Sequence, residues 1–188
     1  MTIAVDRATL VRRALVEVVA ERGLHGASMS MIAKAAGVAV GTAYVHYADK
    51  EDLLLAAYRE VKADLGVVAV EAASPADAPK DRFLRIWHAV AGHLSEDPVR
   101  ARFLAQVAVS PYARIAHDAV MESSDQGFSQ AIVACDLVGE FADLPPEVLY
   151  DLGMGPLIRQ VAAEEELTDT QWAALGDACW RAVAADPC

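Results

Sequence analysis

Residues 37–54 have the sequence GVAVGTAYVHYADKEDLL, and this stretch decides how the chain folds. One helix is expected to end just before Gly37, and a second, short helix follows over residues 40–46. A third helix is expected to start at Asp49, with Lys50 in its first turn. Two short helices joined by a turn that contains glycine form a helix-turn-helix, whose second helix can enter the major groove of DNA.

The helix expected over residues 40–46 has two different faces. Ala43 and Tyr47 share one side of a helical wheel and are expected to face the protein interior. The outward surface is small, uncharged and hydrogen-bonding, and it is made by Gly41, Thr42, Tyr44 and Val45. His46 and Lys50 can donate hydrogen bonds to phosphate oxygens. This surface is therefore the candidate for contact with DNA.

Charge is distributed unevenly along the chain. The 188 residues carry a net charge of −11, which by itself is unfavourable for binding DNA. Residues 1–50, however, hold six Lys or Arg against four Asp or Glu, whereas the remainder holds ten against 23. An acidic body repels DNA and leaves the N-terminal module to approach it. We therefore expect a few placed groups, and the pairing of two modules, to provide phosphate binding.

Composition also narrows the class of protein. A hydrophobic fraction of 55% allows a sizeable core, yet no apolar run reaches the ~18 residues that a membrane span needs. The N-terminus mixes charged and apolar residues, unlike a secretory signal. The three cysteines, Cys135, Cys179 and Cys188, show no metal spacing, so a reduced, cytoplasmic setting is expected. We find no catalytic constellation and expect no enzyme activity, cofactor or metal.

Helical periodicity and turn residues predict an all-α chain of about nine helices. A three-helix module over residues 1–50 precedes a larger helical domain over residues 51–188. Ser28 and Thr168 are the expected N-caps of two helices. The expected ranges are 6–22, 28–36, 40–46, 49–73, 80–94, 98–109, 111–138, 146–165 and 169–185.

The last two helices are apolar enough to form a dimer interface. Paired with the same helices of a second copy, they would form a four-helix interface. The expected interface residues are Leu149, Leu152, Gly153, Leu157, Val161, Trp172, Leu175, Cys179 and Trp180.

Aromatic, histidine and methionine side chains in the middle of the chain are candidates for lining a ligand cavity. For any single one, an ordinary place in the core or at the surface is the simpler interpretation. The candidates are Trp87, His88, Phe103, Tyr112, His117, Met121 and Phe128.

The N-terminal third resembles the TetR family of bacterial transcriptional regulators. The matching positions are Gly23, Ala27-Ser28-Met29, Ile32-Ala33-Lys34-Ala35-Ala36-Gly37-Val38, Gly41-Thr42, Tyr44, His46-Tyr47, Lys50-Glu51 and Leu53-Leu54. The resemblance implies a homodimeric regulator, most often a repressor, that a small ligand releases from a palindromic DNA operator. It also implies DNA contacts from Thr42, Tyr44, His46 and Lys50, and from the helix start at Ser28 and Ser30.

Two positions depart from the family pattern. Tyr47 stands where phenylalanine is usual and should still pack inward. Val40 stands where a polar base-reading residue is expected. Base readout would then depend on apolar contacts from Val40, Gly41 and Val45, and on DNA shape.

Two further interpretations remain open at this stage. The chain can be an all-α ligand-binding or enzymatic module whose helix-turn-helix serves association only, as its weak basic charge and neutral helix surface suggest. Activation of transcription is equally compatible with these residues. The effector, the operator and the regulated genes are left open.

Overall fold

The computed structural model describes residues 6–74, 77–121 and 135–185, and within these ranges the regular elements are helices. The predicted all-α fold is therefore confirmed. In chain order the elements are α1 (Arg7–Gly26), α2 (Met29–Ala35), α3 (Val40–His46), α4 (Lys50–Ala72), α5 (Pro79–Glu96), α6 (Pro98–Ala108), α7 (Ala113–Met121), the 3-10 helix η1 (Val138–Glu140), α9 (Pro146–Gly153), α10 (Gly155–Ala163) and α11 (Asp169–Val183).

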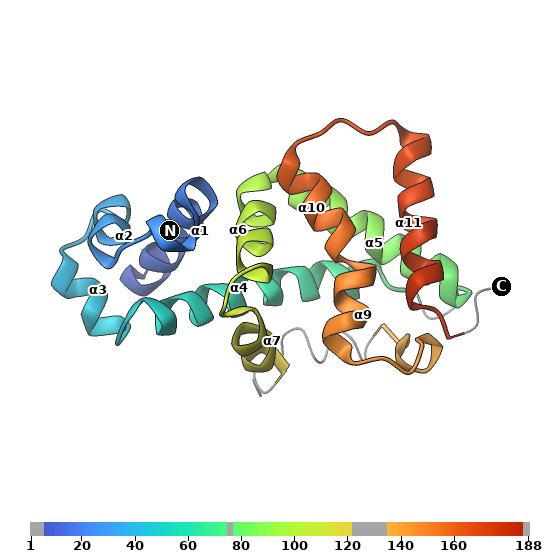
Figure 1. Cartoon of the computed structure of the whole chain (residues 1–188), viewed down its shortest axis with the longest axis horizontal. Coiled ribbons are helices and arrows are strands. Elements are labelled where there is room, and N and C mark those ends of the chain that lie inside the picture. Colours follow the sequence, from blue (N-terminus) through green and yellow to red (C-terminus); the bar gives the residue numbers. More distant parts are fainter. Residues whose placement is uncertain (1–5, 75–76, 122–134, 186–188) are drawn as a thin grey trace, which may run out of the picture.

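The helices form two groups that α4 connects. Figure 1 shows α1, α2 and α3 clustered at one end, with α4 running from this cluster into the larger group that contains α5 and α9 to α11. Because α4 continues without a break from Lys50, the domain boundary expected at residue 50 falls in its first turn. A movement of α4 would therefore displace parts of both groups of helices.

Apolar residues at helical spacing explain why α4 lies where it does. Its predicted apolar stripe is buried, with Leu53, Leu54, Ala57 and Val61 each at most 5% exposed. Such a stripe is stable only when other helices cover it. In this chain α1 packs on its N-terminal half, and α5 and α7 pack further along.

The helix expected over residues 111–138 is wrong at its C-terminal end. The described part of this helix is α7, Ala113–Met121, and residues 122–134 lie outside the described part of the chain. Asp136 has a φ of 51°, in the left-handed region, and a 3-10 turn follows from Val138. A left-handed residue interrupts the backbone hydrogen bonds of an α-helix, so this segment turns instead of continuing.

The single helix expected over residues 146–165 is also wrong, because the structure divides it into α9 and α10. Met154 stands between them with φ −102° and ψ −28°. Pro156 occupies the first turn of α10, where its missing N–H costs nothing. The chain thus changes direction between Gly153 and Gly155. As a result α9 packs against α11, and its Tyr150 ring meets Lys62 of α4.

The described residues contain neither a helix that could cross a membrane nor a cluster that could hold a metal ion. None of their helices is long and apolar enough to cross a membrane. No group of three or more His, Cys, Asp or Glu side chains in the same ranges is placed to hold a metal ion.

Candidate nucleic-acid interface

The turn between α2 and α3 depends on Gly37. Its φ is +68°, a backbone conformation that residues with a Cβ rarely adopt. The Gly37 N–H donates to the carbonyl of Lys34, and the Val38 N–H donates to the carbonyl of Ala33. These bonds close the turn and set the angle between the two helices.

The inward face of α3 is held by Ala43 and Tyr47, as predicted. Ala43 is fully buried, and Tyr47 is 6% exposed. The Tyr47 hydroxyl donates to the carbonyl of Ala8 at 3.2 Å and accepts from Nη1 of Arg12 at 2.6 Å. The hydroxyl that distinguishes this residue from phenylalanine therefore ties the end of α3 to α1.

The opposite face of α3 is open to solvent and has no carboxylate. Tyr44 is 52% exposed and Val45 is 80% exposed. Val40, Gly41 and His46 are also exposed, and Thr42 is half-buried. Methyl groups, a phenol and an imidazole can make apolar contacts with bases and hydrogen bonds to phosphates.

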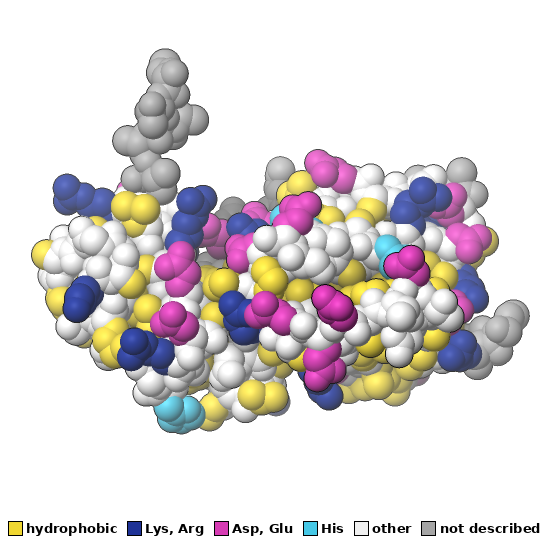
Figure 2. Space-filling view, turned by 90° about the horizontal axis from the view of Figure 1, so that it is seen from above, with side chains coloured by type: hydrophobic (Ala, Val, Ile, Leu, Met, Phe, Trp, Pro, Cys, Tyr) yellow, Lys and Arg dark blue, Asp and Glu magenta, His cyan; other side chains and the backbone are white. Residues whose placement is uncertain are grey.

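Charge at this end of the molecule agrees with such a role. On the face shown in Figure 2, basic side chains are spread over the end that carries α1 to α3, and acidic side chains gather over the rest of the molecule. The N-terminal module is thus the less acidic part of an acidic protein.

The two serines at the start of α2 have different environments. Ser28 is the N-cap, as predicted, and its Oγ accepts a hydrogen bond from the Met31 N–H at 3.3 Å. Ser30 is exposed one residue inside the helix. Capping uses one lone pair of the Ser28 hydroxyl, so its O–H remains able to donate to a phosphate.

Lys50 has a structural role that its sequence position does not reveal. Its ammonium donates to the carbonyls of Leu24 at 2.9 Å and Ala27 at 3.1 Å. These carbonyls lie where α1 gives way to α2, after Gly23 breaks the helix with a φ of 70°. Because an ammonium has three N–H donors, one remains for a phosphate oxygen. Lys50 therefore joins α4 to the link between α1 and α2.

Arg12 is a second residue whose importance the sequence did not indicate. Its guanidinium hydrogen-bonds to the carboxylate of Glu60 on α4, to the Tyr47 hydroxyl and to Thr9. Burial acts to lower the pKa of Arg12, but Glu60 and Tyr47 outweigh it and raise that pKa. One side chain thus connects α1, the end of α3 and α4.

Substitution of two glycines by alanine should change the free energy of unfolding in opposite directions. Gly37→Ala is expected to lower the free energy of unfolding by about 1–2 kcal/mol, because alanine is strained at a positive φ. Gly41→Ala, inside α3 with open space around its position, should raise it by about 0.5–1 kcal/mol. Urea denaturation of both variants measures this. Equal effects of the two changes would contradict the assigned turn geometry.

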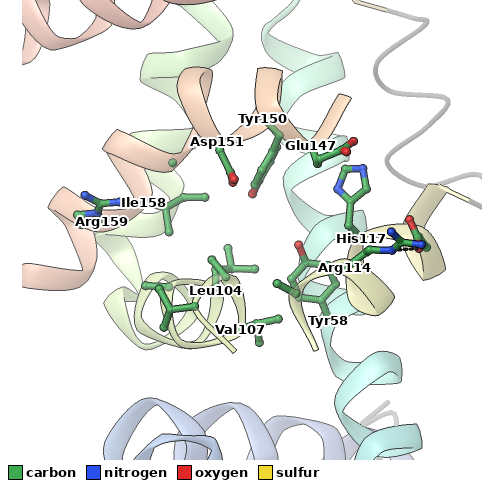
Figure 3. A pocket seen from close by; sticks show the side chains of 16 residues that line it. Tyr58, Leu104, Val107, Arg114, His117, Glu147, Tyr150, Asp151, Ile158 and Arg159 are labelled. Carbon is green, nitrogen blue, oxygen red and sulfur yellow. Dashed lines mark ion pairs between the residues drawn. The ribbon is translucent and has the colours of Figure 1, made fainter. Parts of the chain in front are cut away.

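A pocket of about 770 Å³ lies in the C-terminal group of helices. Figure 3 shows Tyr150 and Asp151 of α9 pointing into it opposite Tyr58 of α4, with Leu104 and Val107 of α6 below. Burial and the Asp151 carboxylate raise the pKa of Tyr58 to about 12, so this phenol is a hydrogen-bond donor at neutral pH. The other lining residues are Ala105, Ala108, Val109, Ala113, Arg114, His117, Asp118, Glu147, Gly155, Ile158 and Arg159.

The expected pocket residues are mostly elsewhere. Of the seven, His117 lines the pocket, and Phe128 lies outside the described residues. The expectation that Trp87 and Phe103 line the pocket is wrong, because both side chains are fully buried in the core. The exposed His88 and Met121 and the half-buried Tyr112 also lie outside the lining. Helical spacing indicated the apolar side of each helix, but not whether that side faces the core or the pocket.

Lys62 is a buried residue behind Tyr150, which lines the pocket. The sequence around it predicted no role for it. The side chain is 2% exposed, and its Nζ lies 3.4 Å from the centroid of the Tyr150 ring. Burial lowers the pKa of Lys62 well below its ordinary value, and the Asp151 carboxylate acts in the opposite direction. A lysine within the apolar face of α4 is the signal that could have drawn attention to it.

Five of the nine expected interface residues are buried within one chain. Gly153, Leu157, Val161, Cys179 and Trp180 contact the rest of the same protein and are not surface residues that a second copy could cover. This corrects the expectation for them. Leu152 is exposed, and Leu149, Trp172 and Leu175 are half-buried.

Comparison with known proteins supports the assignment of the N-terminal module as a helix-turn-helix. Residues 11–57 match the family model described as bacterial regulatory proteins, tetR family. The fatty acid metabolism regulator protein of Bacillus subtilis (strain 168) is 51% identical over 47 residues. That stretch covers 25% of this chain and 24% of the Bacillus protein, so the likeness is confined to about a quarter of each.

Solved structures resemble the whole chain. A TetR family transcription regulator from Marinobacter aquaeolei VT8 has a TM-score of 0.67 and 24% identity, with 95% of each chain covered. The fatty acid degradation regulator FadR from Bacillus halodurans has a TM-score of 0.69 and 21% identity, covering 95% of this chain and 97% of that one. At such identities the likeness establishes the fold. Residues 11–57 therefore match the DNA-binding module of bacterial regulatory proteins of the tetR family, and the chain as a whole shares the fold of solved TetR family transcription regulators.

Proposed function

We propose that the protein is a homodimeric repressor that binds a palindromic operator and is released from it by a small molecule in the pocket. The observation that carries this proposal is the course of α4. The helix starts at Lys50, which holds the helix-turn-helix, and it presents Tyr58 to the pocket. A ligand that moves Tyr58 would therefore act on the same rigid element that positions α3.

A second helix supports the same route. Leu104 and Val107 of α6 line the pocket, and α6 also packs against α1 of the DNA-binding module. Between α1 and α4 stands the Arg12–Glu60 contact. A ligand that binds one arrangement of these helices better than the other would shift the equilibrium between them.

Dimerisation is proposed because a single module is weakly charged. Residues 1–50 carry a formal charge of only +2, so two modules are needed for strong phosphate binding. Each α3 would enter one of two successive major grooves, and the proposed DNA contacts are those expected from the sequence. The exposed residues of α9 and α11 remain available to a second copy, and localisation in the cytoplasm accords with this role.

The test is binding to the DNA upstream of the protein's own gene, followed by fluorescence anisotropy across a range of salt concentrations. A repressor of this kind should bind one fragment with an affinity that falls steeply as salt rises. Absence of a salt-dependent complex with any genomic fragment would overturn the proposal. If DNA binds but the affinity of the pocket ligand is the same with and without operator, the two sites are not coupled, because allostery is reciprocal.

His46→Ala should weaken DNA binding by about fivefold, which corresponds to roughly 1 kcal/mol for a lost hydrogen bond. Because we assign His46 to a phosphate, the loss should be similar for operator and for an unrelated duplex. His88→Ala is the matched control, since His88 is also exposed but lies on α5. A loss confined to the operator would show instead that His46 reads a base.

The relatives also suggest one class of effector. Two of them are regulators of fatty acid metabolism or degradation, which makes a fatty carboxylate a candidate. The sequence likeness to the Bacillus subtilis protein, however, covers only 47 residues, 25% of this chain, so the fatty carboxylate is no more than a candidate.

A further inference from the structure

The short connection between α3 and α4 is fixed by two reciprocal hydrogen bonds. The Asp49 carboxylate accepts from the Asp52 N–H at 2.9 Å, and the Asp52 carboxylate accepts from the Ala48 N–H at 3.0 Å. Only residues 47–49 separate the two helices. Because such a connection leaves the backbone little freedom, α3 and the first turn of α4 behave as one unit.

The Tyr47 hydroxyl attaches this unit to α1. Tyr47 is the first residue after α3, and its hydroxyl donates to the carbonyl of Ala8 and accepts from Arg12. The side chain is only 6% exposed, so it is too deeply buried to contact DNA itself. A phenylalanine ring would fill the same space but could make neither hydrogen bond. The hydroxyl therefore acts on the placement of α3 and not on the DNA.

Arg12 extends this contact to the middle of α4. Its Nη1 donates to the Tyr47 hydroxyl, and its Nε donates to the carboxylate of Glu60. Arginine suits this position because its planar group carries five N–H donors in a fixed arrangement. Glu60 lies within one helical turn of Tyr58, which lines the pocket. The end of α3 is thus connected, through one side chain, to the part of α4 that borders the pocket.

The contact between Arg12 and Glu60 borders a second cavity. A space of about 310 Å³ lies between α1, α4 and α6, and both residues line it together with Val16, Val61 and Val99. Arg12 and Glu60 keep 24% and 33% of their side-chain surface exposed. Because the interior on this side is not closely packed, the contact can break and re-form without opening the apolar core. It is therefore suited to setting the angle between helices.

We propose that Tyr47 is a positioning residue for operator recognition, and that its hydroxyl acts through Arg12 and Glu60 to set the orientation of α3. Two α3 helices of a dimer fit successive major grooves only when both are correctly oriented. Binding to an unrelated duplex depends instead on charge, which the hydroxyl does not alter. The inference rests on the proposed function, because it requires an operator.

Tyr47→Phe removes the hydroxyl and keeps the ring. Fluorescence anisotropy on the full chain should give an operator affinity about tenfold lower than that of the wild type, the loss expected for a hydrogen bond to a charged group. Affinity for an unrelated duplex of the same length should stay within about twofold. Tyr112→Phe is the matched control, because Tyr112 lies in the link between α6 and α7. Equal losses for the two duplexes, or no loss, would overturn the inference.

Glu60→Gln tests whether Tyr47 acts through Arg12. It keeps the shape of the side chain, removes its charge and should weaken operator binding in the same selective way. Because both changes break one set of contacts, the double variant should bind operator at most about twofold more weakly than the weaker single variant. A larger loss would show that Tyr47 and Glu60 act independently and would overturn the inference. Glu71→Gln controls for net charge, since Glu71 is exposed on α4 and outside the cavity lining.

Hydrogen–deuterium exchange separates this inference from the proposed function. In Tyr47→Phe the amides of α3 should exchange about tenfold faster than in the wild type, while those of α5 keep their rate. If the wild type binds no operator, the proposed function fails, and unchanged exchange in α3 overturns the positioning role as well, whereas faster exchange confined to α3 supports it. If Tyr47→Phe binds operator as well as the wild type does, the repressor proposal survives and the positioning role does not.

Discussion

Trp87→Ala is expected to lower the free energy of unfolding by about 3–5 kcal/mol, the cost of removing a large buried aromatic side chain. Trp87 is fully buried, and its Nε1–H donates to the carbonyl of Gly153 at 3.0 Å. The ring also meets Trp172 edge-on, with centroids 5.5 Å apart. Alanine would leave a cavity and a carbonyl without its donor at the junction of α5, α9 and α11. Urea denaturation of the full chain measures the loss.

A milder change at the same position separates packing from hydrogen bonding. Trp87→Phe keeps most of the volume and should cost about 1–3 kcal/mol, chiefly through the orphaned Gly153 carbonyl. Trp172→Ala is the control, because Trp172 is only half-buried and its loss should be smaller than that of Trp87. If Trp87→Ala left stability unchanged and abolished binding of a pocket ligand, the placement of Trp87 in the core would be wrong.

Val45→Asp is expected to weaken operator binding about a hundredfold without destabilising the protein. Val45 is 80% exposed on α3, so a polar residue there costs little in folding. In the proposed complex the new carboxylate would be buried against DNA with no counter-charge, a penalty of about 2–5 kcal/mol. Fluorescence anisotropy with the operator duplex measures the effect, and thermal denaturation checks stability.

Val67→Asp is the matched control for this variant. Val67 is 57% exposed on α4, beyond the helix-turn-helix, and its substitution makes the same change in charge. It should leave DNA affinity within about twofold of the wild type, because the charge is far from the proposed groove contacts. Normal operator binding by Val45→Asp would show that α3 does not occupy the groove.

The sequence alone determined the helix-turn-helix and the general class of fold. Gly37 predicts a turn because few other residues tolerate a positive φ, and the structure has 68° there. Ala43 and Tyr47 predict the inward face of α3, since helical spacing places them on one side. These features depend on residues near one another in the chain. Local geometry is sufficient to specify them, and so they could be predicted without a structure.

Only the tertiary structure decided which residues act together across the chain. Lys50 meets carbonyls 23 and 26 residues away, and Arg12 meets Glu60 across 48. The pocket likewise combines Tyr58 with Asp151, whereas Trp87, predicted for the cavity, turns into the core. Periodicity identifies the apolar side of a helix, but it does not specify which neighbours cover that side. That choice follows from the packing of all the helices together, which also creates the pocket between Tyr58 and Asp151.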